Sequence, residues 1–144
     1  MAAPITFPLT VFYDASCPLC ASEMHALAAR ARDARLVLVD CSAPDFDERP
    51  FAVDGVTRAA MLARIHARDA DGHWLAGVDV FAEAYRAAGF SRIARLFASA
   101  RLRPLWTRLY PWLARNRQRL SRWQLFRVYD LLARSPCERC GTRL

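Results

Sequence analysis

Apolar and polar positions in the N-terminal part of the chain follow the pattern of a strand, a helix and a second strand. Residues 9–13 and residues 36–39 are short apolar runs rich in β-formers, and the second run is apolar enough to be buried on both faces of a sheet. Between them we expect a helix that begins at Pro18, because proline is favoured at the first helical position. Its buried face is marked by apolar residues at helical spacing, namely Cys20, Met24, Leu27, Ala28 and Ala31. If the two strands are neighbours, they should pair in parallel with a right-handed crossover.

The segment after the second strand contains the signals of a loop, a short helix and a hairpin. Residues 42–56 are rich in proline, aspartate and glycine, which indicates a loop. Thr57 can cap a helix that ends near Ala63. Further on, residues 65–68 and 73–75 predict the two strands of a β-hairpin. The residues between them are typical of a turn: Asp69, Ala70, Asp71 and Gly72.

A helix with one apolar face is predicted to close this part of the chain. Asp79 can cap its start and Gly89 can end it. Its apolar face consists of Phe81, Ala84, Tyr85 and Ala88. The order of elements fits an α/β fold, with a thioredoxin-like sheet and flanking helices. We therefore assign residues 1–90 to one domain of this class.

The remaining residues, 91–144, are predicted to form an Arg-rich helical C-terminal extension packed on that domain. Their apolar side chains fall into three stripes at helical spacing. The stripes are Ile93, Leu96, Phe97 and Ala100; Leu105, Trp106, Leu109, Trp112 and Leu113; and Trp123, Phe126, Tyr129 and Leu132. A bend is expected before Pro111, because proline removes a helical hydrogen bond.

Charge divides the chain in nearly the same place. All 21 basic residues are arginines. Residues 1–88 hold 8 of them with 12 acidic residues, whereas residues 89–144 hold 13 with 2 acidic residues. Such an asymmetry indicates two substructures and argues against a uniformly basic nucleic-acid binder.

Four arginines of the extension lie beside two tryptophans in the sequence: Arg115, Arg117, Arg119 and Arg122 with Trp112 and Trp123. The interpretation we favour is that the apolar stripes pack on the domain while the arginines face water and the acidic half. A second interpretation is contact with an anionic membrane surface, for which basic residues with tryptophan are typical. A third is an RNA or an acidic protein, but no recognition motif accompanies the charge and we do not expect nucleic-acid binding.

The sequence shows neither a secretory leader nor a membrane span. The N-terminal residues lack a basic segment followed by an apolar run, and the stretch Ile93–Leu113 is interrupted by arginines. We therefore expect a cytoplasmic chain, in which permanent disulfides are rare. In that setting cysteine pairs indicate redox centres or metal ligands.

The first cysteine pair, Cys17-Pro18-Leu19-Cys20, lies between the predicted first strand and first helix. The unpaired N–H groups and the positive dipole end of a helix N-terminus favour a thiolate, which is the reactive form of cysteine. We expect Cys17 to be the more exposed sulfur and the nucleophile. Cys20, one turn further on, is expected to resolve the mixed disulfide. The alternatives are half of a zinc site and a pair without chemistry.

Three stretches of the chain resemble the DCC family of predicted thiol-disulfide oxidoreductases. They are Val11-Phe-Tyr-Asp14-Ala-Ser-Cys17-Pro-Leu-Cys20, then Ala70-Asp-Gly72 with Gly77-Val-Asp-Val-Phe81, and Tyr110-Pro-Trp-Leu-Ala-Arg-Asn-Arg117 with a later cysteine. The resemblance implies a thioredoxin-like fold and disulfide exchange at Cys17 and Cys20, with Asp14 as the third motif residue.

The chain departs in two positions from the patterns of this family and of thioredoxins. Ala15 stands where the family usually has glycine. Thioredoxins also place a cis-proline before a later strand, facing the disulfide, but the corresponding residues 59–65 contain no proline. Docking of a substrate peptide is therefore expected to differ.

Asp14 has two interpretations. A carboxylate near Cys20 can accept the proton of the resolving thiol, although its charge opposes thiolate formation at Cys17. Alternatively, an aspartate at the end of a strand caps the turn that follows. The sequence does not decide between them.

A second pair, Cys137-Glu-Arg-Cys140, lies near the C-terminus. It can be a relay dithiol that exchanges with the first pair, half of a zinc site formed by all four sulfurs, or a tail without chemistry. The fifth cysteine, Cys41, follows an apolar strand and is expected to be a small packed hydrophobe.

Together these observations predict a thiol-disulfide oxidoreductase that uses no organic cofactor and no metal. Its partner would be a disulfide-containing protein or a small thiol compound. The alternative functions are a zinc-binding module and a module that binds a membrane or protein partner through the basic extension.

Overall fold

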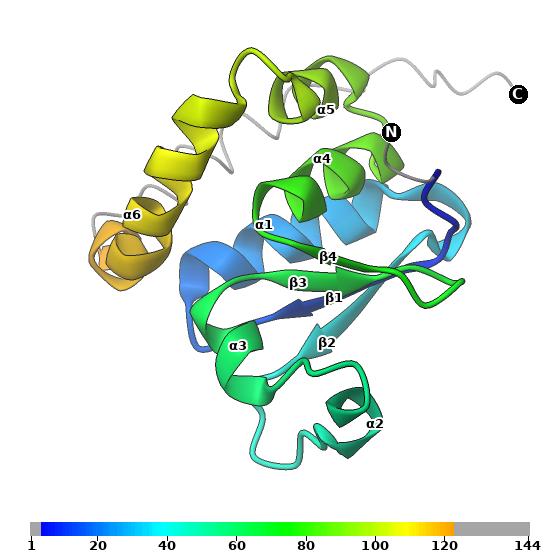
Figure 1. Ribbon diagram of the computed structural model, residues 1–144, viewed down its shortest axis with the longest axis vertical. Coiled ribbons are helices and arrows are strands. Elements are labelled where there is room, and N and C mark those ends of the chain that lie inside the picture. The colour runs from blue at the N-terminus through cyan, green and yellow to red at the C-terminus, as the bar shows by residue number, and fades with distance from the viewer. Residues whose placement is uncertain (1–3, 123–144) are drawn as a thin grey trace, which may run out of the picture.

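The computed structural model describes residues 4–122 and has a four-stranded mixed sheet surrounded by helices (Figure 1). The strands are β1 (Leu9–Tyr13), β2 (Leu36–Asp40), β3 (His66–Arg68) and β4 (Trp74–Ala76). The α-helices are α1 (Pro18–Arg30), α2 (Arg49–Ala52), α3 (Arg58–Ala63), α4 (Val78–Ala87), α5 (Ser91–Ala98) and α6 (Arg103–Arg122), and a short 3₁₀ turn, η1, covers Arg32–Ala34. This arrangement confirms the predicted α/β class and is consistent with a thioredoxin-like fold. The third predicted stripe and the second cysteine pair lie outside the described residues.

The strand order is β2-β1-β3-β4, so β1 lies inside the sheet and β2 lies at its edge. β1 and β2 are parallel, as predicted, and β3 and β4 form the predicted antiparallel hairpin. The expectation that residues 36–39 are buried on both faces is wrong. Because β3 pairs with the other side of β1, β2 has a neighbour on one side only. On the sheet face that it shares with Thr10, Val37 is 42% exposed.

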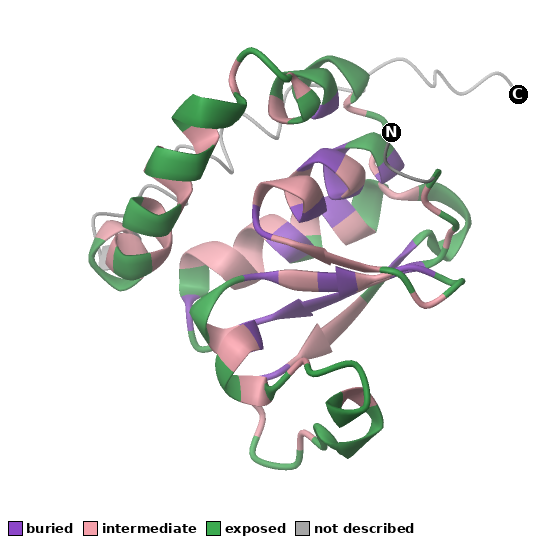
Figure 2. Ribbon diagram, in the orientation of Figure 1, coloured by how far each residue is buried: buried purple, intermediate pink, exposed green. Residues whose placement is uncertain are grey.

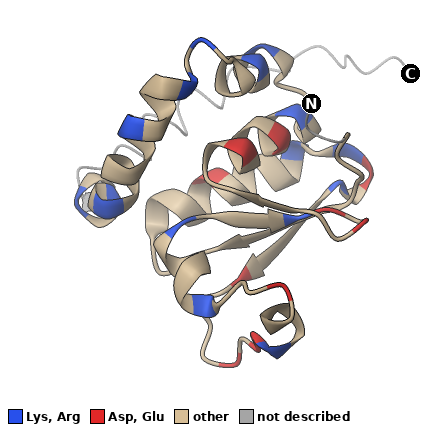
Figure 3. Ribbon diagram, viewed as in Figure 1, with Lys and Arg blue, Asp and Glu red and all other residues tan. Residues whose placement is uncertain are grey.

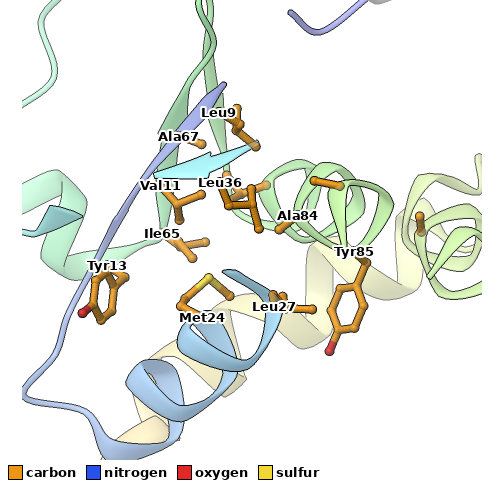
Figure 4. Packing of buried hydrophobic residues seen from close by; sticks show 13 residues of the cluster. Leu9, Val11, Tyr13, Met24, Leu27, Leu36, Ile65, Ala67, Ala84 and Tyr85 are labelled. Atoms are coloured by element: carbon orange, nitrogen blue, oxygen red, sulfur yellow. The ribbon is translucent and has the colours of Figure 1, made fainter. Parts of the chain in front are cut away.

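The two faces of the sheet are covered by different helices (Figure 1). Alternate residues of β1 point to opposite faces. Leu9, Val11 and Tyr13 join the core beneath α1 and α4 (Figure 4), while Phe12 packs with Cys41 and Met61 on the other face. Figure 2 shows the resulting gradient, with buried residues concentrated in the sheet and on the helix faces that meet it.

Two helix starts test the predicted caps. The Thr57 side chain accepts a hydrogen bond from the Ala60 N–H at 3.2 Å, which confirms that it caps α3. Asp79 does not cap α4, because the helix begins at Val78 and its N-cap is Gly77, two residues before Asp79. Gly77 has φ +64°, a conformation that favours glycine, and Asp79 instead forms an exposed ion pair with Arg103 of α6.

The helices of the extension do not bury the apolar stripes that the sequence predicts. In α5, Ile93 and Leu96 are exposed, whereas Ala94 is buried. α6 is one helix that contains Pro111 in its interior. Leu105 and Trp112 are half exposed, so the second stripe is not a single buried face. None of the helices within residues 4–122 combines the length and apolarity that a membrane crossing requires.

Candidate active site

Cys17 is the N-cap residue of α1, the position that the sequence predicts. Strand β1 ends at Tyr13, and a tight turn follows in which the Cys17 N–H donates to the Asp14 carbonyl at 3.2 Å. Pro18 occupies the first helical position, and the Ala21 N–H donates to the Cys17 carbonyl at 3.0 Å. The backbone of Cys17 is extended and its side chain makes no capping bond. The thiol therefore lies at the positive end of α1, where a negative charge is stabilised.

The expected exposure of the two sulfurs is reversed. Cys17 is fully buried, whereas Cys20 is partly exposed. The prediction rested on the local strand–helix junction, but α6 packs against α1 and brings the guanidinium of Arg117 to this junction. A substrate disulfide can reach the Cys17 sulfur only after a neighbouring group moves.

The two thiols have opposite acidities. A hydrogen bond from Cys20, assisted by the positive charge of Arg117, lowers the pKa of Cys17 to about 6 against the opposing effects of burial and Asp14. The pKa of Cys20 is raised, because its thiol donates to Cys17 and is partly desolvated. These shifts favour a thiolate on Cys17 and a proton on Cys20. Both cysteines are free in this structure.

Asp14 is buried and bound on both of its carboxylate oxygens. Its Oδ1 accepts hydrogen bonds from the Ser16 N–H, at 3.0 Å, and from the Ser16 hydroxyl. Its Oδ2 accepts from Arg117 Nη2 at 2.7 Å. Asp14 thus has the turn-capping contact expected of a strand-end aspartate and, in addition, an ion pair with the extension.

Arg117 is the site residue that the sequence reasoning missed. Besides Asp14, its Nη2 donates to the Leu62 carbonyl at 2.6 Å, so one guanidinium joins the turn before α1 to the end of α3. Arg115 and Arg119 are exposed, as expected for this cluster, but Arg117 faces inward. Its spacing from Trp106, Tyr110 and Leu113 places it on the same helical face as these residues, and that periodicity was the available signal.

A second contact between α6 and the domain lies at the segment where thioredoxins place the cis-proline. Ile65 precedes β3, and its backbone N–H donates to the Tyr110 hydroxyl of α6 at 3.1 Å. Proline has no N–H and would lose this bond. In this chain the position is therefore used to anchor the extension.

A cavity of about 250 Å³ lies between the cysteine pair and the inner face of α6. Cys20, but not Cys17, contributes to its wall, together with Asp14 and Arg117. Most of the remaining wall is apolar and comes from α1, α4, α5 and α6. The cysteine pair, through Cys20, and the extension therefore line the same cavity.

The family model of the DCC1-like thiol-disulfide oxidoreductases matches residues 11–123 of the chain. The chain belongs to the DCC1-like thiol-disulfide oxidoreductase family. The match covers the cysteine pair, all of the sheet except the first two residues of β1, and the whole of α6, so Cys17 and Arg117 both belong to the DCC1-like region.

Among curated proteins, the DCC1-like chain is similar to an uncharacterized chloroplastic protein of Arabidopsis thaliana. The two are 30% identical over 87 residues, which is 60% of this chain and 40% of the plant protein. This chain thus aligns with less than half the length of that relative. No solved structure matches it.

Of the predictions for the other cysteines, the structure tests only the one for Cys41. Cys41 is fully buried beside Phe12 and Met61, which confirms the prediction of a small packed residue. Its thiol donates to the Tyr13 carbonyl, and burial raises its pKa to about 11. The zinc interpretation is not tested, because Cys137 and Cys140 lie outside the described residues. Within residues 4–122, Cys17 and Cys20 do not gather with a third potential metal ligand.

Proposed function

We propose that this chain exchanges thiols and disulfides through the Cys17–Cys20 dithiol. The observation that carries the proposal is the Cys17 thiol at the start of α1, which receives a hydrogen bond from Cys20 and lies in the field of Arg117. These groups favour the thiolate that attack on a disulfide requires. Membership of the DCC1-like family supports the same chemistry.

The reaction we propose has two displacement steps. The Cys17 thiolate attacks one sulfur of a substrate disulfide, the substrate S–S bond breaks, and the leaving thiolate takes up a proton. Cys20 then loses its proton and attacks the Cys17 sulfur, which forms the Cys17–Cys20 disulfide and releases the second substrate thiol. Two electrons pass from the dithiol to the substrate, and the reverse sequence oxidises a substrate dithiol.

Asp14 is a candidate acceptor for the Cys20 proton, because both residues contribute to the wall of the same cavity. Its Oδ2 is bound by Arg117, so protonation would weaken that ion pair.

The function is tested by a single-turnover reaction of the reduced chain with hydroxyethyl disulfide. Peptide mapping without reductant should find a Cys17–Cys20 disulfide, formed in proportion to the thiols lost. A chain whose Cys17 and Cys20 remain reduced, or in which only Cys137 and Cys140 are oxidised, would contradict the proposal.

The outer face of α6 supports a second candidate function, which is contact with an anionic membrane surface. α5 and α6 carry arginines but no acidic residue, in contrast to the rest of the described chain (Figure 3). Leu105, Arg108, Trp112, Arg115 and Arg119 recur at helical spacing and are all exposed. This combination of apolar and basic side chains is typical of helices that lie in a membrane interface.

Vesicle sedimentation tests this second function. The chain should bind vesicles that contain phosphatidylserine at low salt, and binding should weaken as salt rises. A Trp112→Ser/Leu105→Ser variant should bind less while its dithiol remains active. Equal sedimentation with anionic and neutral vesicles would argue against the proposal.

A further inference from the structure

The cavity beside Cys20 is a partly open pocket on the inner side of α6. A volume of about 250 Å³ approaches that of small-ligand sites, which are largely apolar pockets with a few polar groups. Its wall includes Leu19, Phe81, Trp106 and Leu113, which gives it this apolar character.

The charged side chains in the wall already have partners within the protein. Arg117 is paired with Asp14 at 2.7 Å. Glu23 accepts a hydrogen bond from the Tyr85 hydroxyl at 2.8 Å, and burial raises its pKa, which favours the neutral carboxyl. An anionic ligand group would therefore lose its hydration here without gaining a free counter-charge, and the Cys17 thiolate would repel it. The wall thus disfavours an anionic ligand, and its apolar character favours an uncharged one.

The size of the cavity limits the ligand further. A closed apolar cavity of roughly 150 Å³ accommodates benzene, so the present one has room for about a dozen non-hydrogen atoms. A peptide would bring several backbone N–H and C=O groups, each of which needs a partner when buried. The described wall offers few such partners, among them the hydroxyl of Tyr110.

We propose that this cavity binds the apolar part of a small, uncharged organic disulfide and presents its sulfurs to the Cys17–Cys20 pair. The proposal rests on the function proposed above and names its substrate class. The sulfur atoms would lie at the Cys20 end, because Cys20 is in the wall and its thiol is hydrogen-bonded to Cys17. Cys17 itself is buried outside the wall, so its attack requires the movement of a neighbouring group described above. The exchange steps are those given above, with both electrons supplied by the reduced dithiol.

Lipoamide, an uncharged cyclic disulfide on a short aliphatic chain, serves as the probe. Single-turnover oxidation of the reduced full-length chain is measured with lipoamide and with oxidised glutathione, which is larger and charged. Each rate is divided by the rate of the same disulfide with free dithiothreitol, which removes intrinsic reactivity. The normalised rate for lipoamide should exceed that for glutathione by about tenfold or more.

Ala114 of α6 contributes to the wall and provides the variant. Ala114→Phe fills the cavity and should lower the normalised lipoamide rate by about tenfold, a larger fall than for glutathione. Ala114→Leu, which adds less volume, should have an intermediate effect and guards against a folding defect in the larger variant. Gln118→Phe adds the same ring at an exposed position of α6 and is the matched control.

Binding is measured separately by calorimetry with octanamide, an uncharged aliphatic amide without sulfur. It should bind the chain and the Gln118→Phe variant, but more weakly the Ala114→Phe variant. Equal normalised rates for the two disulfides, or a lipoamide rate that Ala114→Phe leaves unchanged, would overturn the inference. If neither disulfide oxidises Cys17 and Cys20, the proposed function fails, and absence of octanamide binding would show that the cavity assignment fails as well.

Discussion

Replacing Cys20 by serine should leave Cys17 joined to the substrate in a stable mixed disulfide, and replacing Cys17 should abolish exchange at this pair. The reason is the division of acidity between the sulfurs: Cys17 is favoured as the thiolate, whereas Cys20 holds its proton until the second step. With hydroxyethyl disulfide, Cys20→Ser should accumulate one adduct, located at Cys17 by mass spectrometry. Cys17→Ser should fall to the background rate of an unactivated thiol, a loss of about 100-fold or more.

Cys41→Ser is the matched control for these two variants. Cys41 is buried on the other face of the sheet and has a raised pKa, so its replacement should leave the exchange rate unchanged within about twofold. A Cys137→Ser/Cys140→Ser variant tests the relay interpretation, which predicts slower reoxidation or reduction of the first pair. An adduct on Cys20 in the Cys17→Ser variant, formed at the wild-type rate, would show that the roles of the two cysteines are the reverse of those proposed.

Arg117→Gln should both destabilise the fold and make Cys17 less acidic. Asp14 is only 6% exposed, and without Arg117 its carboxylate would be left without a countercharge. Breaking a buried ion pair costs about 3–5 kcal/mol, and because Arg117 keeps some solvent contact we expect a loss of about 2–4 kcal/mol in the free energy of unfolding. The pKa of Cys17 should rise above about 6, yet stay below that of an ordinary cysteine, because the bond from Cys20 is the larger influence.

The matched control for this change is Arg119→Gln, which removes the same charge from an exposed position of α6. It should change the free energy of unfolding by less than about 0.5 kcal/mol. Asp14→Asn combined with Arg117→Gln should recover part of the lost stability, because the unpaired carboxylate is then absent. Equal stabilities of Arg117→Gln and Arg119→Gln, measured by urea unfolding, would show that the ion pair with Asp14 is not a structural link.

Local patterns were sufficient for the elements that carry the cysteine pair. Strand β1, the proline at the start of α1 and the Thr57 cap each depend on a few neighbouring residues, and each was predicted correctly. The edge position of β2 was not predictable in this way, because it depends on where β3 returns to the sheet. The exposure of Val37 depends on which elements cover its face of the sheet, and its own segment does not show that.

The candidate site shows the same division between local and distant information. The helix N-terminus that favours a thiolate at Cys17 is a local feature. The electrostatic effect of Arg117 on Cys17 depends on α6, a helix that begins more than eighty residues later in the chain. Apolarity alone grouped Leu105 and Trp112 with the buried residues, whereas the inner face of α6 carries Tyr110 and Arg117. An inward arginine is rare without a buried acid as its partner, and only the fold shows that Asp14 is there.

We expect Cys17 to be a thiolate at neutral pH, and a titration of thiolate absorbance in the ultraviolet measures this without requiring a reagent to reach the buried sulfur. The absorbance difference between the reduced chain and its Cys17→Ser variant should rise with an inflection near pH 6, because deprotonation of Cys17 is favoured by Cys20 and Arg117. An inflection at or above pH ~8.5, the value of an ordinary cysteine, would show that Cys17 is not activated.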